Sequence, residues 1–465
     1  MNDSSAPQTD DRHLQNPFAP ATEEITAFDL PVSGALPANL EGRYLRIGPN
    51  ALGVEDPAAH QWSAGPGMVH GVRIRDGKAE WYRNRWVRSP GVRDALNEST
   101  GNKARPAGAD VAPNTTVIAH AGRTLALMEA GALPYELDSE LNTVGIYEPG
   151  ITAQGFTTSP HAKFDPHTGE LHSLAYLPGV EFVQHIVSDS TGQITQVTDI
   201  PIPGETRYMH DFSLTQRYVI LYDTPAVFDS EALQRGIDDV SLLTWDDDSP
   251  GRVGILPRAG GPVRWIESDP SFIGHTLNAY DDGSSIVLDV IRMDGPVNVN
   301  DAAAMRPTLD RWTVDLRAGV VRQQRLDDRP QEFPRVNDLL AARPHRYGYS
   351  AANAVITGAF PTNGEHHHEV LNDALIKHDF DNGSAEVHGF PNGTTIGEAA
   401  FAAEPAGSGK EDDGYLMAYA HDPERGAADL VILSAQDFTG PPLARVHLPT
   451  RVPLGFHGSW IPDHE

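Results

Sequence analysis

The chain has 465 residues and no cysteine, and its 64 acidic residues against 35 basic ones leave a formal charge of −29. This charge repels phosphate backbones and excludes nucleic acid as a partner, and the lack of thiols excludes disulfides and thiolate metal sites. No uncharged run of about 18 apolar residues occurs, so no transmembrane helix is expected.

The first 22 residues are polar and acidic, without the basic and apolar stretches of a secretory signal. Their composition predicts a disordered tail over residues 1–22, followed by a single domain over residues 23–465. We expect a cytoplasmic protein.

Short stretches rich in Val, Ile, Tyr and Leu alternate with Gly, Asp and Asn turns, which is typical of β-hairpins. The predicted hairpins lie at 72–83, 163–177, 186–200, 279–293, 312–326 and 378–390. Helical periodicity is scarce, and its better candidates are 132–141 and 229–243. Many hairpins of similar size favour an all-β fold, a β-propeller, whose radial blades hide most sheet edges. The repeat is too degenerate for the blades to be counted.

Four histidines lie in apolar, strand-like or turn-like settings that are far apart in the chain. They are His161, His210, His275 and His457, separated by 49, 65 and 182 residues. No local helix or loop could gather them, so only a closed fold could bring them to one axis. If they meet, four imidazoles without a thiolate favour a redox-active metal ion with positions left open for a small molecule.

Other metal-binding and catalytic patterns do not meet their requirements. Three consecutive histidines, 366–368, would point to alternate faces of a strand, and their neighbours indicate an exposed loop. The stretches 165–170 and 411–416 lack the spacing of a calcium loop and are interpreted as turns. The motifs of serine hydrolases, nucleotide hydrolases and zinc proteases are not found.

An ordered set of segments spanning roughly residues 25–460 resembles the carotenoid cleavage oxygenase family. The segments are PANLEGRYLRIGPN (37–50), HQWSAGPGMVHGVRIRDGKAEW (60–81), PNTTVIAHAGRTLALMEAGALPYELD (113–138), SPHAKFDPHTGEL (159–171), MHDFSLTQRYVILYDTP (209–225), VGILPRAGGPVRWIE (253–267), HTLNAYDDG (275–283), EFPRVN (332–337), EDDGYLM (411–417) and FHGSW (456–460).

The resemblance implies a seven-bladed β-propeller with a cap of loops and short helices over the metal face. It also implies a non-haem Fe(II) centre that uses O2 to cleave a conjugated C=C bond of an apolar polyene into two carbonyl products. Inner strands of different blades all point at the central axis, which would account for the wide spacing of the histidines.

The same resemblance assigns residues around the metal. Three glutamates match family positions that hydrogen-bond metal ligands: Glu129, Glu332 and Glu398. In that order they would hold His210, His275 and His457, which leaves His161 without a carboxylate. Ligating imidazoles commonly donate their other N–H in this way, and buried carboxylates offset the charge of the ion. Thr115 matches a threonine whose methyl group crowds one metal position.

The substrate class depends on two missing residues. The family branch that cleaves lignin-derived stilbenes has a lysine directly before the first of these glutamates and an upstream tyrosine, and both contact the substrate phenol. Here Met128 occupies the lysine position, and the upstream stretch 93–108 has no tyrosine. An apolar side chain suits the wall of a polyene tunnel, so we expect a carotenoid or apocarotenoid. Met128 could equally be core filling.

The segment 226–245 is a candidate entrance for an apolar substrate. Its residues Phe228, Leu233, Ile237, Val240 and Leu243 fall near one helical face. Packing of that face on the propeller rim explains the pattern at least as well, and the acidic residues of the segment oppose anionic lipid. We expect at most transient membrane contact and no obligate protein partner.

Several functions stay open at this point. One is the Fe(II) dioxygenase, acting on a carotenoid or on a stilbene, and another is a non-catalytic propeller whose histidines are structural or hold zinc. Isomerohydrolase chemistry of the retinoid type, also found in the family, is a third. The joint presence of four histidines, three glutamates and Thr115 favours the dioxygenase, because a binding module would not need them.

Overall fold

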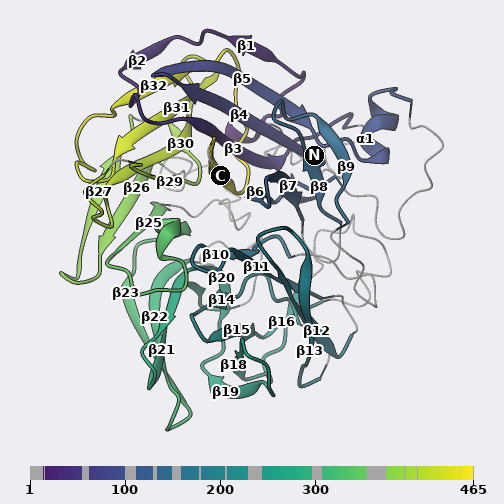
Figure 1. Ribbon diagram of the computed structural model, residues 1–465, viewed down its shortest axis with the longest axis vertical. Coiled ribbons are helices and arrows are strands. Elements are labelled where there is room, and N and C mark those ends of the chain that lie inside the picture. The colour runs from purple at the N-terminus through teal and green to yellow at the C-terminus, as the bar shows by residue number, and fades with distance from the viewer. Residues whose placement is uncertain are drawn as a thin grey trace, which may run out of the picture.

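The protein is a ring of β-sheets, seen along its shortest axis in Figure 1. This computed structural model describes residues 14, 16–54, 62–99, 112–128, 133–148, 159–176, 180–204, 207–228, 243–295, 306–352, 373–391, 393–405 and 407–463. Within these residues the strands form seven blades, which we number in the chain order of their innermost strands.

The strands of the blades are as follows, and each blade is given from its innermost strand outward. Blade 1 holds β6 (Thr116–His120), β7 (Arg123–Leu127), β8 (Tyr135–Leu137) and β9 (Thr143–Ile146). Blade 2 holds β10 (Lys163–Asp165), β11 (Glu170–Ala175), β12 (Phe182–Ser188) and β13 (Ile194–Pro201). Blade 3 holds β14 (Ser213–Leu214), β15 (Tyr218–Asp223), β18 (Gly251–Pro257) and β19 (Arg264–Ser268).

Blade 4 holds β20 (Phe272–Asp281), β21 (Ser285–Met293), β22 (Thr308–Asp315) and β23 (Val320–Asp327). Blade 5 holds β24 (Gln331–Arg335), β25 (Tyr347–Ala352), β26 (Ala374–Asp379) and β27 (Ser384–Gly389). Blade 6 holds β28 (Thr395–Ile396) and β29 (Ala400–Ala403), both paired with β30 (Gly414–Asp422), then β31 (Ala427–Ser434), β32 (Ala444–His447) and β2 (Val32–Gly34). Blade 7 holds β33 (Gly458–Pro462), β3 (Gly42–Pro49), β4 (Gly67–Arg75), β5 (Lys78–Trp86) and β1 (Thr26–Phe28).

The two ends of the chain close the ring together. The C-terminal strand β33 is the innermost strand of blade 7, where Arg46 of β3 pairs with Gly458. The N-terminal strand β2 is the outermost strand of blade 6, where Val32 pairs with Val446 of β32. A closed ring has no free inner edge, so the innermost strands of the blades face one another across the axis.

The six hairpins expected from the sequence are all present as antiparallel strand pairs. The turn between β4 and β5 shows why the local sequence folds this way. Asp76 and Gly77 have φ angles of 50° and 66°, the left-handed conformation that a two-residue hairpin turn requires. The stretch 165–170 is also a turn, as expected, and joins β10 to β11.

The structure does not confirm the two predicted helices. Residues 135–137 of the predicted helix 132–141 form strand β8, so that prediction is wrong. Tyr135 and Leu137 are buried on either side of the half-buried Glu136, a period of two that fits a strand better than a helix. Leu243, the last residue of the predicted helix 229–243, begins strand β17 (Leu243–Trp245), which pairs with β16 (Ala226–Phe228). Residues 229–242 lie outside the described residues.

Helices are short wherever the structure describes the chain. They are α1 (Pro90–Ala95) and the 3-10 helices η2 (Asn16–Phe18), η4 (Trp62–Ala64) and η5 (Asp338–Leu340). The cap of loops and short helices over the metal face stays a prediction from the resemblance. No helix in the described part of the chain has the length and apolar character needed to cross a bilayer.

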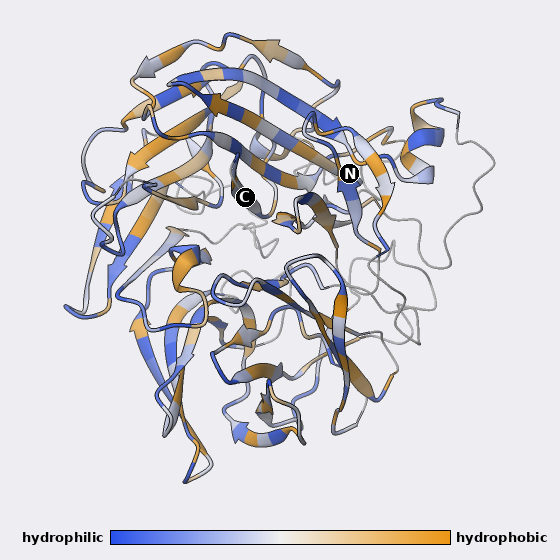
Figure 2. Ribbon diagram, in the orientation of Figure 1, coloured by the Kyte–Doolittle hydropathy of each residue, from blue (hydrophilic) through white to orange (hydrophobic). Residues whose placement is uncertain are grey.

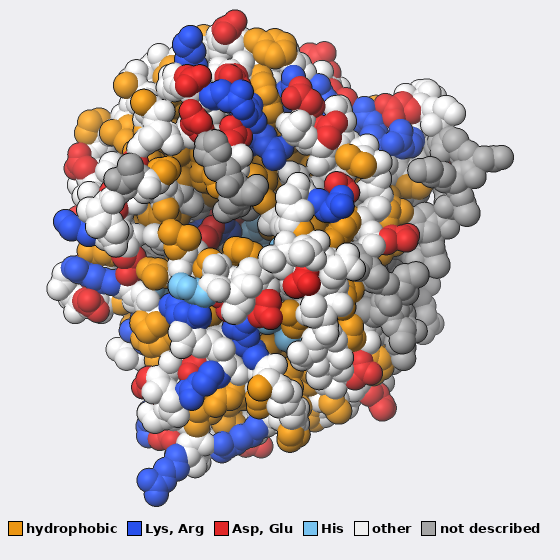
Figure 3. Space-filling model, viewed as in Figure 1, with side chains coloured by type: hydrophobic (Ala, Val, Ile, Leu, Met, Phe, Trp, Pro, Cys, Tyr) orange, Lys and Arg blue, Asp and Glu red, His pale blue; other side chains and the backbone are white. Residues whose placement is uncertain are grey.

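The apolar core lies between neighbouring blades, and Figure 2 shows orange segments along the middle strands of the sheets. One cluster joins blades 6 and 7 through Tyr44, Tyr82 and Tyr419. In the expected tail, Phe18 is buried and packs edge-on against Trp62, so packed structure begins before residue 23. Figure 3 shows acidic and basic side chains interspersed on the visible face, without a basic groove there for a phosphate backbone.

Candidate metal centre

The four predicted histidines all come from the innermost layer of the propeller. His161 precedes β10, His210 precedes β14, His275 lies within β20, and His457 directly precedes β33. Four different blades therefore supply one imidazole each. This explains how histidines that are 49, 65 and 182 positions from the next one along the chain reach one place.

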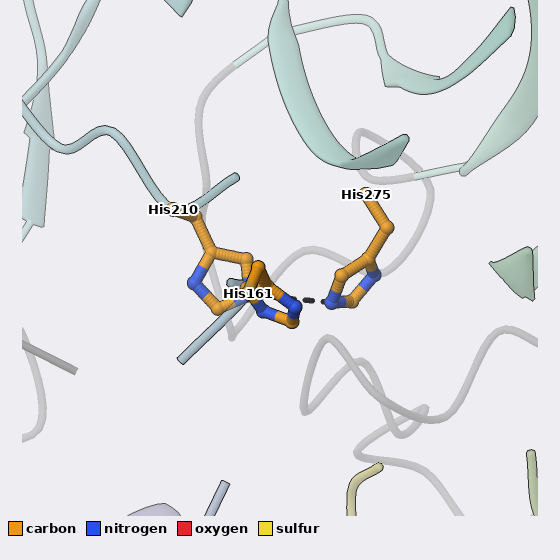
Figure 4. A group of neighbouring side chains, drawn as sticks. All are labelled: His161, His210 and His275. Atoms are coloured by element: carbon orange, nitrogen blue, oxygen red, sulfur yellow. Dashed lines mark hydrogen bonds between the residues drawn. The ribbon is translucent and has the colours of Figure 1, made fainter. Parts of the chain in front are cut away.

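Three of the imidazoles converge directly, as Figure 4 shows. The Nε2 atoms of His161 and His210 are 3.1 Å apart, and those of His210 and His275 are 3.3 Å apart. The potential ligand atoms of all three residues lie within 4.8 Å of one another. His161 and His275 are buried, and His210 is partly exposed.

His457 completes the group. Its ring centroid is 4.6 Å from that of His161 and 4.8 Å from that of His275, and the rings are close to perpendicular. The centroids of His161 and His275 are also 4.8 Å apart. The four rings thus surround one point on the axis.

The spacing of the nitrogens fits a shared metal ion. Neighbouring ligands held at roughly 2.1 Å from an ion are about 3.0 Å apart at a right angle and about 3.4 Å apart at a tetrahedral angle. The two measured Nε2 separations, 3.1 and 3.3 Å, fall within that range. Burial and the neighbouring imidazoles hold the pKa of His161 well below its usual range, which keeps this ring neutral as a ligand must be.

Glu332 on β24 lies directly behind His275. Its Oε2 is 2.6 Å from Nδ1 of His275 and also accepts a hydrogen bond from the backbone N–H of Phe333. A Cβ atom on Gly274 would lie 2.6 Å from Oε1 of Glu332, so a glycine is needed here to leave room for the carboxylate. When Nδ1 donates to this carboxylate, the lone pair of Nε2 faces the axis.

Glu398, between β28 and β29, holds His457 in the same way. Its Oε1 is 3.0 Å from Nδ1 of His457, and its Oε2 accepts the backbone N–H of Gly458 at 2.8 Å. Burial by itself would raise the pKa of Glu398, but Arg335 and His457 outweigh it and lower the pKa to about 2. The carboxylate is therefore charged at neutral pH.

The third predicted pair includes Glu129, which lies outside the described residues. A residue that the sequence did not point to also stands beside His210. The hydroxyl of Tyr208 is 2.9 Å from Nδ1 of His210, and the two rings stack 5.5 Å apart. The signal in the sequence was the spacing of two residues, which puts both side chains on one face of an extended segment.

Thr115 lies next to the fourth ligand, directly before β6. Its carbonyl oxygen accepts a hydrogen bond from the backbone N–H of His457 at 3.0 Å. Its hydroxyl donates to Oδ1 of Asn114 at 2.9 Å, and Asn114 in turn donates to the carbonyl oxygens of Ser63 and Gly65. The hydroxyl is therefore engaged by the preceding residue in the chain.

Two further expectations concern the surroundings of the centre. That His161 has no carboxylate partner stays a prediction from the resemblance. The three histidines 366–368 lie outside the part of the chain that the structure describes. Met128 follows β7 directly and is half-buried.

Residues 18–462 match the family model described as retinal pigment epithelial membrane protein. The chain is 40% identical to the carotenoid cleavage oxygenase of Mycobacterium tuberculosis, over 99% of this chain and 100% of that protein.

Solved structures of two proteins are also similar over nearly their whole length. A mutant of the apocarotenoid oxygenase of Synechocystis has a TM-score of 0.82 at 25% identity, covering 95% of this chain and 97% of that one, and the cobalt-substituted enzyme gives the same values. The lignostilbene dioxygenase of Pseudomonas brassicacearum has a TM-score of 0.84 at 26% identity, covering 98% of this chain and 100% of that one.

Proposed function

The chain belongs to the carotenoid cleavage oxygenase family and is an enzyme of the dioxygenase type, and on that premise we propose that it uses Fe(II) and O2 to cleave a carotenoid or apocarotenoid. One conjugated C=C bond of the polyene is cleaved to two carbonyl products. The observation that carries the proposal is the arrangement of four imidazoles around one point, two of them held from behind by carboxylates.

The four histidines would hold the ion, and a set of neutral imidazoles without thiolates is a donor set that iron accepts. When bound, the iron supplies the activation of O2, so that each carbon of the cleaved bond receives one oxygen atom. Glu332 and Glu398 keep the Nδ1 protons of their histidines in place, which directs both Nε2 lone pairs at the axis. Their negative charges also offset the cost of burying a divalent ion.

The remaining roles concern access to the centre. Thr115 is fixed beside His457 by a backbone hydrogen bond, and its hydroxyl is taken up by Asn114. We propose that Thr115 limits how ligands approach the metal. We also propose that Glu129 hydrogen-bonds His210. In the described residues His210 contacts Tyr208.

The substrate assignment rests on the missing lysine and tyrosine more than on Met128, the residue at the lysine position. A lignin-derived stilbene is the second candidate, because the lignostilbene dioxygenase of Pseudomonas brassicacearum is similar over its whole length. Phenol-directed cleavage needs polar groups that bind and activate a hydroxyl, whereas a thioether side chain offers an apolar surface. A polyene is instead positioned by burial along its length, at about 0.8 kcal/mol for each buried CH2 equivalent.

A single assay separates these substrates. Protein purified without oxygen and loaded with Fe(II) would be incubated side by side with apocarotenals and with 4-hydroxystilbenes under isotopically labelled O2, and the products identified by mass. We expect cleavage of an apocarotenal at one internal double bond, with label in both carbonyl products. Efficient stilbene cleavage without apocarotenal turnover would contradict the substrate assignment and leave the iron centre intact.

The isomerohydrolase alternative is tested by adding an ester of a polyene alcohol to the same assay. That reaction would isomerise the polyene and hydrolyse the ester with water, so the polyene alcohol released would keep its carbon number and no C=C bond would be broken. The location in the cytoplasm and the at most transient contact with a membrane stay predictions from the sequence.

A further inference from the structure

A buried carboxylate lies next to a candidate metal ligand in the chain and belongs to none of the assigned groups. Asp211 follows His210, and its side chain is 1% exposed. Asp211 belongs to blade 3, and its two oxygens meet donors from blades 2 and 4.

The partners of Asp211 are all close neighbours of ligands. Nζ of Lys163, two residues after His161, is 2.7 Å from Oδ1 and 3.0 Å from Oδ2. The backbone N–H and the hydroxyl of Thr276, the residue after His275, donate to Oδ2 at 2.9 and 3.1 Å. One carboxylate thus joins the strands that carry His161, His210 and His275.

The geometry around this carboxylate is that of a buried ion pair. The ammonium group of Lys163 lies within hydrogen-bonding distance of both carboxylate oxygens. The charged form accepts stronger hydrogen bonds than a neutral amide would. Lys163 also lies 5.8 Å from the centroid of the Phe212 ring, which places its charge over an aromatic face.

The three ligands need such a connection because they belong to three separate sheets. Apolar contacts between blades are not directional. They therefore do not fix the position of one inner strand along the next. A shift of 1 Å between strands would take the Nε2 atoms away from separations of 3.1 and 3.3 Å. Hydrogen bonds at fixed distances define the position of one strand relative to another.

We propose that Asp211 is a positioning residue for the metal centre, and that the Lys163–Asp211–Thr276 contacts hold the strands of His161, His210 and His275 at the spacing that one ion requires. The inference deepens the proposed function and rests on it. A buried ion pair that served stability alone would have no such effect on the metal.

The test compares two buried aspartates. Asp211→Asn removes the charge and keeps the shape. Asp310→Asn is the matched control, because Asp310 is also 1% exposed and accepts from a threonine and from arginines, yet it lies on β22, the third strand of blade 4. Metal-free forms of the wild type and both variants would be titrated with Co(II) alone, followed by visible absorption, and their thermal unfolding recorded.

We expect Asp211→Asn to weaken Co(II) binding by roughly 10–100-fold and to shift the absorption bands of the bound ion. Asp310→Asn should lower the thermal midpoint but leave the Co(II) affinity and spectrum as in the wild type. If Asp211→Asn does not fold, Lys163→Gln tests the same contacts from the other side, with the same expected loss of affinity.

The outcomes separate this inference from the proposed function. A wild type that binds Co(II) and an Asp211→Asn variant, or in its place a Lys163→Gln variant, that binds it equally tightly with an unchanged spectrum would overturn the inference alone. Equal losses of affinity in Asp211→Asn and Asp310→Asn would also overturn it, because the effect would then be one of general stability. A wild type that takes up no Co(II) would overturn the metal centre and this inference with it.

Discussion

At the scale of single residues, one set of side chains in the candidate centre would bind the metal ion and another set orients the ligands. The imidazoles provide the nitrogens, and the carboxylates behind them decide which nitrogen faces the axis. Glu332 meets Nδ1 of His275 at 2.6 Å, and Glu398 meets Nδ1 of His457 at 3.0 Å. Loss of a ligand and loss of its carboxylate should therefore differ in severity.

We expect His275→Ala to abolish iron binding and activity together, because the packed inner ring offers no replacement nitrogen. Glu332→Gln should be milder, with a loss of roughly 10–100-fold in metal affinity or activity, since only the orientation and the charge compensation are weakened. The measurement is iron content per protein alongside turnover. The same alanine change at His161, His210 and His457 extends the test, and full iron occupancy in two of the four alanine variants would contradict the ligand assignment.

At the scale of elements, the inner strands do the positioning, and β33 has a second task because it also closes the ring. Gly458 begins β33 directly after His457 and pairs with Arg46 of β3. A Cβ atom at Gly458 would lie 2.3 Å from the carbonyl oxygen of Leu45, which is backbone and cannot turn aside. The closing of the ring and the placement of the fourth histidine therefore depend on the same residue.

Gly458→Ala should push β33 away from β3, lower the free energy of unfolding by about 1–3 kcal/mol and reduce iron content, since His457 moves with the strand. Gly389→Ala on β27 is the control, because nothing lies within 4 Å of a Cβ atom there. Chemical denaturation and iron quantification of both variants measure the two effects. An unchanged iron content in a destabilised Gly458→Ala protein would contradict the prediction that the placement of His457 depends on the closure of the ring.

At the scale of the whole molecule, buried histidines make the metal-free protein sensitive to acid. Burial lowers the pKa of His185 to about 3, and burial also holds the pKa values of His70 and His161 well below their usual range. In the unfolded chain these groups return to a pKa of about 6.5. Below that pH the unfolded state binds more protons than the folded state, so acid favours unfolding. Glu332 raises the pKa of His275, which works in the opposite direction for that one group.

The thermal midpoint of the metal-free protein should therefore decrease as the pH is lowered from about 7.5 to about 5.5. Each such histidine lowers the free energy of unfolding by at most about 1.4 kcal/mol per pH unit. Scanning calorimetry after chelation measures it. In His185→Gln the decrease should be shallower, because one proton-binding group is removed from the unfolded state. A midpoint that does not change over this range would contradict the prediction.

Much of the architecture could be predicted because it is encoded locally. A hairpin turn such as Asp76–Gly77 depends on the φ angles of two adjacent residues, and the alternation of the flanking strands depends on neighbours only. The helix predicted at 132–141 failed because an apolar pattern in a short segment does not by itself separate a strand from a helix. There the pairing of β8 with β7 and β9 decided the outcome.

The sequence by itself determined which chemistry was available: imidazoles without thiolates, an acidic chain, a series of hairpins, and the motifs that mark the family. Only the tertiary structure decided which groups meet. It brought four of the 20 histidines to one axis, and it placed Tyr208 and Asp211 beside them. The physical reason is that these contacts join different blades, so their distances depend on how whole sheets pack around the ring, which no pattern of neighbouring residues records.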